Sequence, residues 1–80
     1  MNDAPAPALH ELETEVMDVV WELEEASVRE VMDRLNATAP KPRAYTTYMT
    51  ILARLHTKGV LARRREGKTD FHRPVTRRWR

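Results

Sequence analysis

Hydrophobic residues recur every three or four positions over three stretches of the chain, and this spacing predicts three amphipathic α-helices. The first helix is expected from about Leu9 to Leu23, the second from Val28 to about Asn36, and the third within residues 44–59. The three apolar stripes predict one shared core, made of Leu9, Leu12, Val16, Val19, Val20, Leu23, Val28, Val31, Met32, Leu35, Tyr48, Ile51, Leu52 and Leu55.

Local signals mark the ends of these helices. Ser27 and Glu30 have the spacing of a capping box, which predicts the start of the second helix. The preceding residues 24–26 have room for a strand of one or two residues. Two prolines interrupt residues 37–42, and Gly59 is a favourable residue just beyond the end of the third helix.

After the third helix the hydrophobic pattern changes from helical to alternating. Two strands are predicted over Val60–Arg65 and Thr69–Pro74, joined by a turn at Glu66–Lys68. Phe71 is expected to be the inward-facing anchor of the second strand. The order helix, short strand, helix, helix and hairpin predicts a winged helix-turn-helix, a mainly α fold with a small β-hairpin.

The outer side of the third helix is unusual for a solvated surface. It carries Thr47, Thr50, Arg54 and Thr57. Threonine is a mediocre helix former because its branched Cβ restricts χ1, so a solvated face would normally carry other residues. No carboxylate lies between Lys41 and Arg65. Hydroxyl groups and a guanidinium without carboxylates suit a surface that contacts phosphates and base edges, which predicts a DNA-recognition helix.

Charge supports the same interpretation. The 80-residue chain has a formal net charge of only +2, but its two halves differ. Residues 1–40 contain ten acidic and two basic side chains, whereas residues 41–80 contain twelve basic and two acidic ones. The basic half favours a polyanionic partner. The acids of the first helix are expected to form a solvated face that points away from this partner.

Several classes of function find no support in the residues. The chain has no cysteine, and no apolar run approaches the ~20 residues that span a bilayer, so no membrane association is expected. His10, His56 and His72 lie far apart in the sequence without metal-binding spacing. No catalytic grouping or glycine-rich phosphate loop is present. We therefore expect neither an enzyme nor a cofactor.

Motifs along most of the chain resemble one known family. EVMDVVWEL in the first helix, YTTYMTILARLHTKG in the third, and a strand–EGK–strand hairpin occur in order at compatible spacing. In these features the chain resembles the BlaI/MecI family of penicillinase repressors, to which the copper-responsive CopY repressors are related. The resemblance implies a bacterial, cytoplasmic winged-helix repressor that binds a palindromic operator in double-stranded DNA as a homodimer. It also implies a helical C-terminal dimerisation domain that a sensor protease cleaves in antibiotic-responsive members.

The resemblance also suggests how the chain is divided. Residues 1–8 are expected to be a disordered lead, residues 9–75 the winged-helix domain, and residues 76–80 a basic tail at the start of a C-terminal dimerisation region. The chain therefore looks like the DNA-binding half of such a repressor, and alone we expect it to be monomeric or weakly dimeric. Relatives place Trp-Ser-Pro before the third helix, where this chain has Arg43-Ala44-Tyr45. Thr46 is expected to cap the helix instead.

Individual roles follow from side-chain chemistry together with the resemblance. The residues expected to contact DNA are Arg43, Tyr45, Thr46, Thr47, Met49, Thr50, Arg54, Arg65 and Lys68. The threonines suit phosphates, base acceptors and thymine methyl groups, and Arg54 suits a phosphate or a guanine. Met49 suits a thymine methyl group or the core equally well. Arg63 and Arg65 share one face of their strand, and Lys68 lies at the hairpin tip.

A second interpretation uses the same basic face differently. Winged helices can also be protein- or RNA-interaction modules, because a fold does not fix a function. The threonine-rich face argues against a protein interface, where exposed aromatic residues are more typical.

Overall fold

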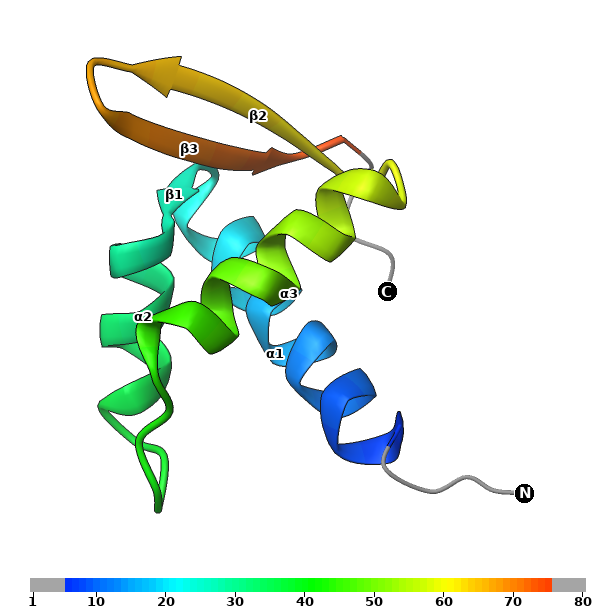
Figure 1. Cartoon of the computed structure of the whole chain (residues 1–80), viewed down its shortest axis with the longest axis vertical. Coiled ribbons are helices and arrows are strands. Elements are labelled where there is room, and N and C mark those ends of the chain that lie inside the picture. Colours follow the sequence, from blue (N-terminus) through cyan, green and yellow to red (C-terminus); the bar gives the residue numbers. More distant parts are fainter. Residues whose placement is uncertain (1–5, 76–80) are drawn as a thin grey trace.

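The computed structural model describes residues 6–75, and their side chains from residue 11 onward. Its elements follow the order α-β-α-α-β-β and are α1 (Ala6–Leu23), β1 (Ala26–Ser27), α2 (Val28–Asn36), α3 (Tyr45–Thr57), β2 (Leu61–Glu66) and β3 (Thr69–Pro74). Figure 1 shows the three helices packed together, with the sheet across one end of the bundle, next to the start of α2 and the end of α3. The predicted winged helix-turn-helix is thus confirmed.

The element boundaries differ from the expected ones at two places. Helix α1 begins at Ala6, three residues earlier than expected, so residues 6–8 are helical rather than part of a disordered lead. The rest of the expected lead, residues 1–5, lies outside the described residues, and so does the expected tail at residues 76–80. In the hairpin, the two-residue loop Gly67–Lys68 joins strands that pair from Glu66 and Thr69.

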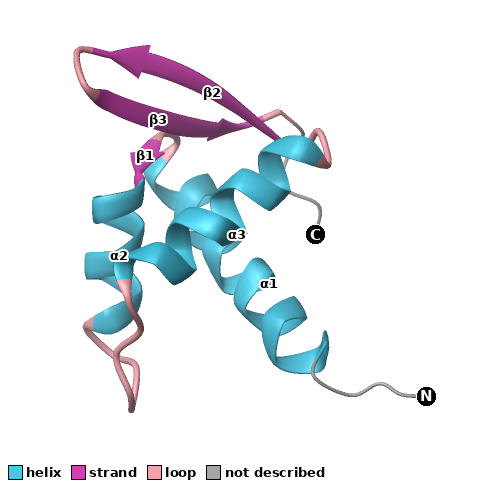
Figure 2. Cartoon of the chain, viewed as in Figure 1, coloured by secondary structure: helices cyan, strands magenta, loops and turns pink. Residues whose placement is uncertain are grey.

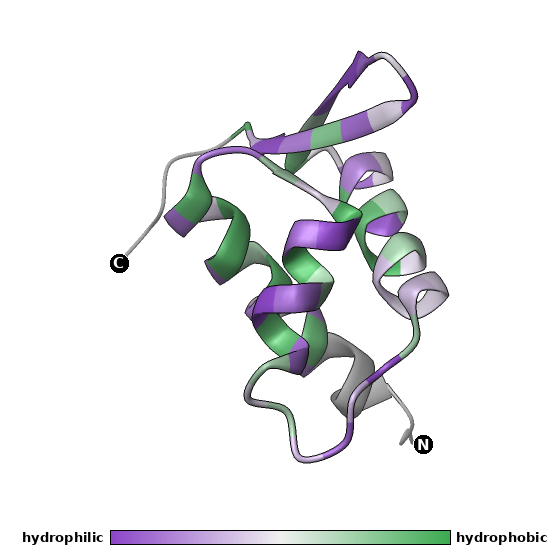
Figure 3. Cartoon of the chain, turned by 90° about the vertical axis from the view of Figure 1, so that its left-hand side faces the viewer, coloured by the Kyte–Doolittle hydropathy of each residue, from purple (hydrophilic) through white to green (hydrophobic). Residues whose placement is uncertain are grey.

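One continuous core holds the three helices and the base of the hairpin together. Its fully buried side chains include Val16 and Val20 of α1, Val31 of α2 and Tyr48 of α3. Trp21, off the main stripe of α1, packs against this core. Each helix is amphipathic, and it is stabilised mostly by the burial of its apolar face in this core. Figures 2 and 3 together show that the hairpin is mostly hydrophilic, whereas hydrophobic stretches gather where the helices face one another.

The sheet has the order β1-β3-β2, and both pairings are antiparallel. The predicted short strand before α2 is present as β1, which pairs Ala26 with His72. Leu61 is 2% exposed and is the point at which the hairpin enters the core. Side chains alternate along a strand, so Arg63 and Arg65 lie on the same face as Leu61.

The expected anchor of β3 was wrong. His72, which is 3% exposed, is the buried side chain of this strand, whereas Phe71 lies on the other face and is half-buried. The register explains the difference, because His72 is directly opposite Arg63 and therefore on the face of Leu61. Phe71 was expected to face the core because it is the more hydrophobic residue. The alternation of side chains along the paired strands places His72 there instead.

Candidate nucleic-acid interface

Helix α3 has a buried side and an outer side. Tyr48, Ile51, Leu52 and Leu55 are buried in the core. On the outer side, Tyr45 and Met49 are each 46% exposed although both are large and apolar. Met49 therefore does not belong to the core, and one of its two expected roles is removed.

A groove separates this outer side of α3 from the wing, the hairpin formed by β2 and β3. Its volume is about 320 Å³, and we call it the wing groove. Tyr45, Met49 and Ala53 line it on α3. Its lining on the wing consists of Arg63, Lys68, Thr69, His72 and Asp70, whose carboxylate accepts a hydrogen bond from Arg65. The first residues of α2 close one end. An apolar helix surface thus faces a basic hairpin across an open space.

The threonines of α3 line a second hollow on the other side of Met49. This hollow, of about 280 Å³, is formed by Thr46, Thr47, Thr50, Ile51 and Arg54. The predicted contact residues of α3 are therefore brought together in two adjacent strips. One strip is apolar and faces the wing, and the other carries hydroxyl groups and a guanidinium.

The start of α3 is held by Asn36, at the end of α2. Asn36 Nδ2 donates to the Arg43 carbonyl oxygen (2.9 Å), and Arg43 N donates to Asn36 Oδ1 (3.0 Å). The Tyr48 hydroxyl donates to the same Oδ1 (2.7 Å). Ala44 is the N-cap and makes no side-chain bond, so the expectation that Thr46 caps α3 was wrong. Sequence reasoning did not identify Asn36, because its partners are seven and twelve residues away.

Glu13 contacts the end of α3 and corrects a second expectation. The acids of α1 do not all form a solvated face, because Glu13 is only 7% exposed. Its carboxylate accepts a hydrogen bond from Lys58 Nζ (3.0 Å) and lies 3.9 Å from Arg54 Nε. Glu13 precedes Val16 by three residues and Val20 by seven, so the spacing of the apolar stripe already places it on the inner side. The Arg54 guanidinium is therefore partly neutralised.

The basic residues of the wing divide between its two faces. Arg63 lies on the groove side, together with Arg65, whose Nη1 donates to Asp70 Oδ1 (3.2 Å). Lys68 is exposed in the loop at the tip, where Gly67 has a φ of 63° that suits the first loop position of a type II′ hairpin. Arg64 points to the opposite face. The groove side thus receives Arg63, Arg65 and Lys68 but not Arg64.

Three ionisable groups outside α3 have shifted pKa values. A hydrogen bond from Arg64 lowers the pKa of Glu25, and the Glu25 and Glu66 carboxylates raise the pKa of Arg64. Burial lowers the pKa of His72, and the nearby Arg63 lowers it further. His72 Nδ1 is buried without a hydrogen-bond partner among the described residues. At neutral pH His72 is therefore uncharged.

The part of the chain that the structure describes offers neither a membrane span nor a metal site. Within residues 6–75, no helix has the length and apolar character that crossing a bilayer requires. Nor do three or more His, Asp or Glu side chains there come close enough together to hold a metal ion.

Comparisons with known proteins agree on one family. The family model described as "Penicillinase repressor" matches residues 9–80. The chain is 38% identical over 68 residues to "Transcriptional regulator BlaI" from Mycobacterium tuberculosis strain CDC 1551 / Oshkosh, and equally to that of strain H37Rv. This match covers 84% of the chain and 48% of the relative, so the chain spans about half the length of the curated relatives it matches.

Solved structures show the same likeness. "Solution structure of the DNA binding domain of the repressor BlaI" superposes with a TM-score of 0.73 at 31% identity, covering 84% of this chain and 79% of that one. "CopR Repressor Structure" superposes with a TM-score of 0.60 at 34% identity, covering 78% and 87% respectively.

Proposed function

Because this chain belongs to the penicillinase repressor family, a family of transcriptional repressors rather than enzymes, we propose that it is a sequence-specific DNA-binding module. One observation carries the proposal. The exposed side of α3 presents methyl, hydroxyl and guanidinium groups beside a basic wing. The solved structure whose title names the DNA-binding domain of BlaI has the same fold.

Helix α3 enters the major groove of duplex DNA in this proposal. The major groove is about 12 Å wide and accepts one α-helix. The wing groove then receives the sugar-phosphate backbone that borders the occupied groove, where Arg63 and Lys68 approach phosphates. Arg65 and Arg43 add positive charge at its edges. In this proposal the contact residues are those expected from the sequence, and Tyr45 donates its hydroxyl to a phosphate.

The composition of α3 restricts which bases it can read. Its residues, Tyr45–Thr57, include no Asn, Gln, Asp or Glu. The usual bidentate reading of adenine needs Asn or Gln, and direct reading of cytosine needs a carboxylate. Methyl contacts to thymine from Met49 and the threonines remain, together with hydroxyl and Arg54 contacts to purine acceptors. We therefore propose half-sites that are read mainly through thymine methyl groups.

Repression follows from two copies acting on one site. Helix-turn-helix dimers bind half-sites related by twofold symmetry, which makes the operator palindromic and lets the dimer block a promoter. The match covers only 48% of the curated relatives, which are longer than this chain. We place dimerisation, and any cleavage by a sensor protease, in the part of such proteins beyond the domain described here. The operator lies in the bacterial cytoplasm, where we expect the protein to act.

A binding titration tests the proposal. Sites are selected from random duplexes with the 80-residue chain, and affinity is then measured at roughly 50 and 200 mM salt. We expect affinity to fall with salt and to fall further when each thymine of the selected site is replaced by deoxyuridine, which lacks only the methyl group. The Thr47→Ala, Thr50→Ala double variant should lose discrimination between selected and random DNA. Thr14→Ala, at an exposed position of α1, also removes a threonine hydroxyl and is the control, which should behave as the parent chain.

Other outcomes favour other functions. Equal affinity for selected and random duplexes at both salt levels refutes sequence-specific reading. Preferential binding of single-stranded or duplex RNA indicates instead that the basic face is an RNA-interaction surface.

A further inference from the structure

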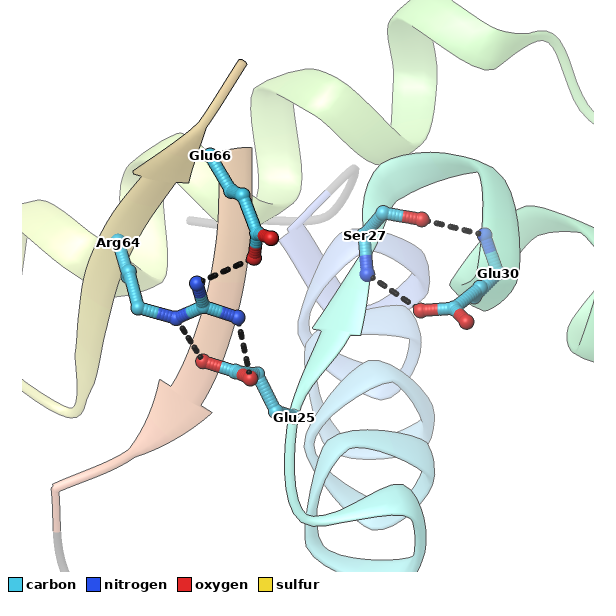
Figure 4. A network of polar contacts seen from close by, with 5 residues as sticks. All are labelled: Glu25, Ser27, Glu30, Arg64 and Glu66. Atoms are coloured by element: carbon cyan, nitrogen blue, oxygen red, sulfur yellow. Dashed lines mark hydrogen bonds and ion pairs between the residues drawn. The ribbon is translucent and has the colours of Figure 1, made fainter. Parts of the chain in front are cut away.

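Arg64 is the middle residue of three consecutive arginines, but its side chain does not lie with those of its neighbours. Arg63 and Arg65 are on the groove side of β2, and Arg64 is on the opposite side. Figure 4 shows its guanidinium directed away from α3 and toward Glu25. A charge that belongs to the basic wing by sequence is therefore directed away from the proposed DNA-binding surface.

The contacts of Arg64 involve all three nitrogens of its guanidinium. Its Nε donates to Glu25 Oε2 (3.0 Å) and its Nη2 to Glu25 Oε1 (2.8 Å), a bidentate pair. Its Nη1 donates to Glu66 Oε1 (2.6 Å), two residues along the same strand. The guanidinium also lies 5.0 Å from the centre of the Phe71 ring. Bidentate pairs and stacking on an aromatic ring are the geometries that fix an arginine most firmly.

These contacts run across one face of the sheet and connect its two edges. Arg64 is on β2, Phe71 is on the central strand β3, and Glu25 immediately precedes β1. Glu24, the residue before Glu25, has a φ of 72°, which is rare for a residue other than glycine. It turns the chain sharply between the end of α1 and β1. Arg64 thus ties the wing to the turn that leaves α1, and we call the contact between Arg64 and Glu25 the clamp.

The core alone does not fix the orientation of the outer wing. Leu61 is the only buried side chain of β2, and Arg63–Glu66 are all exposed. On β3, every residue from Thr69 to Phe71 is at least partly exposed. A two-stranded ribbon without a buried face is only marginally stable in water. Whatever holds this part of the hairpin against the body also sets the width of the wing groove.

We propose that Arg64 is a positioning residue for DNA binding, which acts through Glu25 to hold the wing at the distance from α3 that the DNA backbone requires. This inference rests on the proposed function. In this proposal Arg63 and Lys68 contact the phosphates, and Arg64 does not. Loss of the clamp lets the wing move away from α3, so its cations no longer reach the backbone while α3 can still enter the groove.

Substitution of Glu25 changes DNA affinity in opposite directions, depending on whether Arg64 contacts DNA or positions the wing. Glu25→Gln removes a negative charge and breaks the bidentate pair, because the amide keeps only one acceptor oxygen. If Arg64 were a DNA ligand, this variant would free it and raise affinity, as loss of an acid generally does near a polyanion. If Arg64 positions the wing, affinity for the selected duplex falls. We expect a loss of roughly fivefold, about 1 kcal/mol.

Glu22→Gln is the matched control. Glu22 accepts a hydrogen bond from Arg34 Nη1 (2.6 Å) in another exposed pair, which joins α1 to α2 and does not involve the wing. The substitution makes the same change in charge and turns another arginine–carboxylate pair into a bond to an amide oxygen. We expect it to leave affinity unchanged or slightly increased. Thermal melting of both variants verifies that each is folded at the temperature of the titration.

A second measurement separates positioning from general destabilisation. In an Arg63→Ala, Lys68→Ala background the wing has lost its proposed phosphate contacts, so Glu25→Gln should then have no further effect on affinity. Equal losses in both backgrounds would overturn the proposal, and so would an increase in affinity on Glu25→Gln in the parent chain.

A third measurement needs no DNA. Backbone amide order parameters of Gly67 and Lys68 should fall in Glu25→Gln and remain unchanged in Glu22→Gln. If the parent chain does not bind duplexes selectively, the proposed function fails, and the order parameters still decide whether the clamp holds the wing. Unchanged order in Glu25→Gln would overturn the clamp itself.

Discussion

Helices α2 and α3 begin with nearly the same backbone conformation but are held by different chemistry. The N-cap of α2, Ser27, has φ −84° and ψ 168°, and that of α3, Ala44, has φ −71° and ψ 155°. Ser27 Oγ accepts from Glu30 N (3.1 Å), and Ser27 N donates to Glu30 Oε1 (2.9 Å), as Figure 4 shows. Ala44 has no such side-chain bond.

The difference separates a local constraint from a tertiary one. The start of α2 is fixed locally, by the capping box that Ser27 and Glu30 form within four consecutive residues. The start of α3 is instead held by Asn36, which bonds to the backbone of Arg43 and to Tyr48. The proposed reading helix is therefore positioned by the end of α2. The same contacts of Asn36 hold the first turn of α3 and fix the orientation of α3 relative to α2.

The largest expected effect comes from removing the tertiary constraint. Asn36→Ala leaves the hydroxyl of the fully buried Tyr48 and the polar backbone atoms of Arg43 without their partner. We expect a loss of about 2–3 kcal/mol in unfolding free energy, since the variant removes three hydrogen bonds of ordinary strength. Urea unfolding measures it. Tyr48→Phe removes only one of these bonds and should cost about 1 kcal/mol. A loss as large as that of Asn36→Ala would assign the constraint to the tyrosine alone.

The local constraint should be weaker. Ser27→Ala removes one half of the capping box, and we expect a loss of about 1 kcal/mol. Hydrogen exchange should show faster opening in the first turn of α2 and unchanged protection at Arg43 and Thr47, whose amides are hydrogen-bonded. If protection falls equally in α3, the two helix starts are coupled and the contrast between them is lost.

A local cap can also be added where it is absent. Ala44→Ser places a hydroxyl at the N-cap of α3 and should raise the unfolding free energy by about 0.5–1 kcal/mol. Ala53→Ser makes the same chemical change at an exposed site inside the helix and should be slightly destabilising. A gain in both variants would indicate that the added hydroxyl does not act as a cap.

Most of the fold follows from the sequence because its signals are short in range. The capping box of α2 and the apolar stripes depend on residues within a few positions of one another. The winged helix-turn-helix follows from their order. Met49 remained undecided between core and surface, because it borders the apolar stripe, and only the packing of α3 places it outside.

The features that were missed depend on partners far along the chain. Thr46 was expected to cap α3 because no local alternative was visible, while Asn36 acts from the preceding helix. Glu13 was grouped with the solvated acids because its partners, Arg54 and Lys58, belong to α3. Which residues contact DNA stays a prediction, because it depends on a partner molecule.

The smallest expected effect is a dependence on pH at the start of α2. His72 pairs with Ala26, directly before Ser27, and burial lowers its pKa from the ordinary 6.5. The unfolded chain therefore takes up this proton first, so the histidine contributes full stability above pH 6.5 and loses it as the pH falls below. Arg63 and His56 oppose protonation, and Asp70 favours it.

Hydrogen exchange at two pH values measures this effect. Between pH 7 and roughly pH 5.5, around the ordinary pKa of histidine, protection should fall more at Ser27 than at Thr47. A His72→Phe variant should remove this difference. If protection at both sites falls equally in the parent chain, the pH dependence is global and arises from other groups.

The run of three arginines gives the wing a form of redundancy. Leu61 is the buried reference point of β2, and residues beyond it alternate between the two sides of the ribbon. If evolution deleted Ala62, Arg64 would turn to the side now occupied by Arg63, and Arg65 would come to face Phe71 and Glu25. An identical side chain would thus fill both places after a one-step slip. With three consecutive arginines, a one-residue deletion before the run still leaves an arginine on the groove side and an arginine facing Glu25.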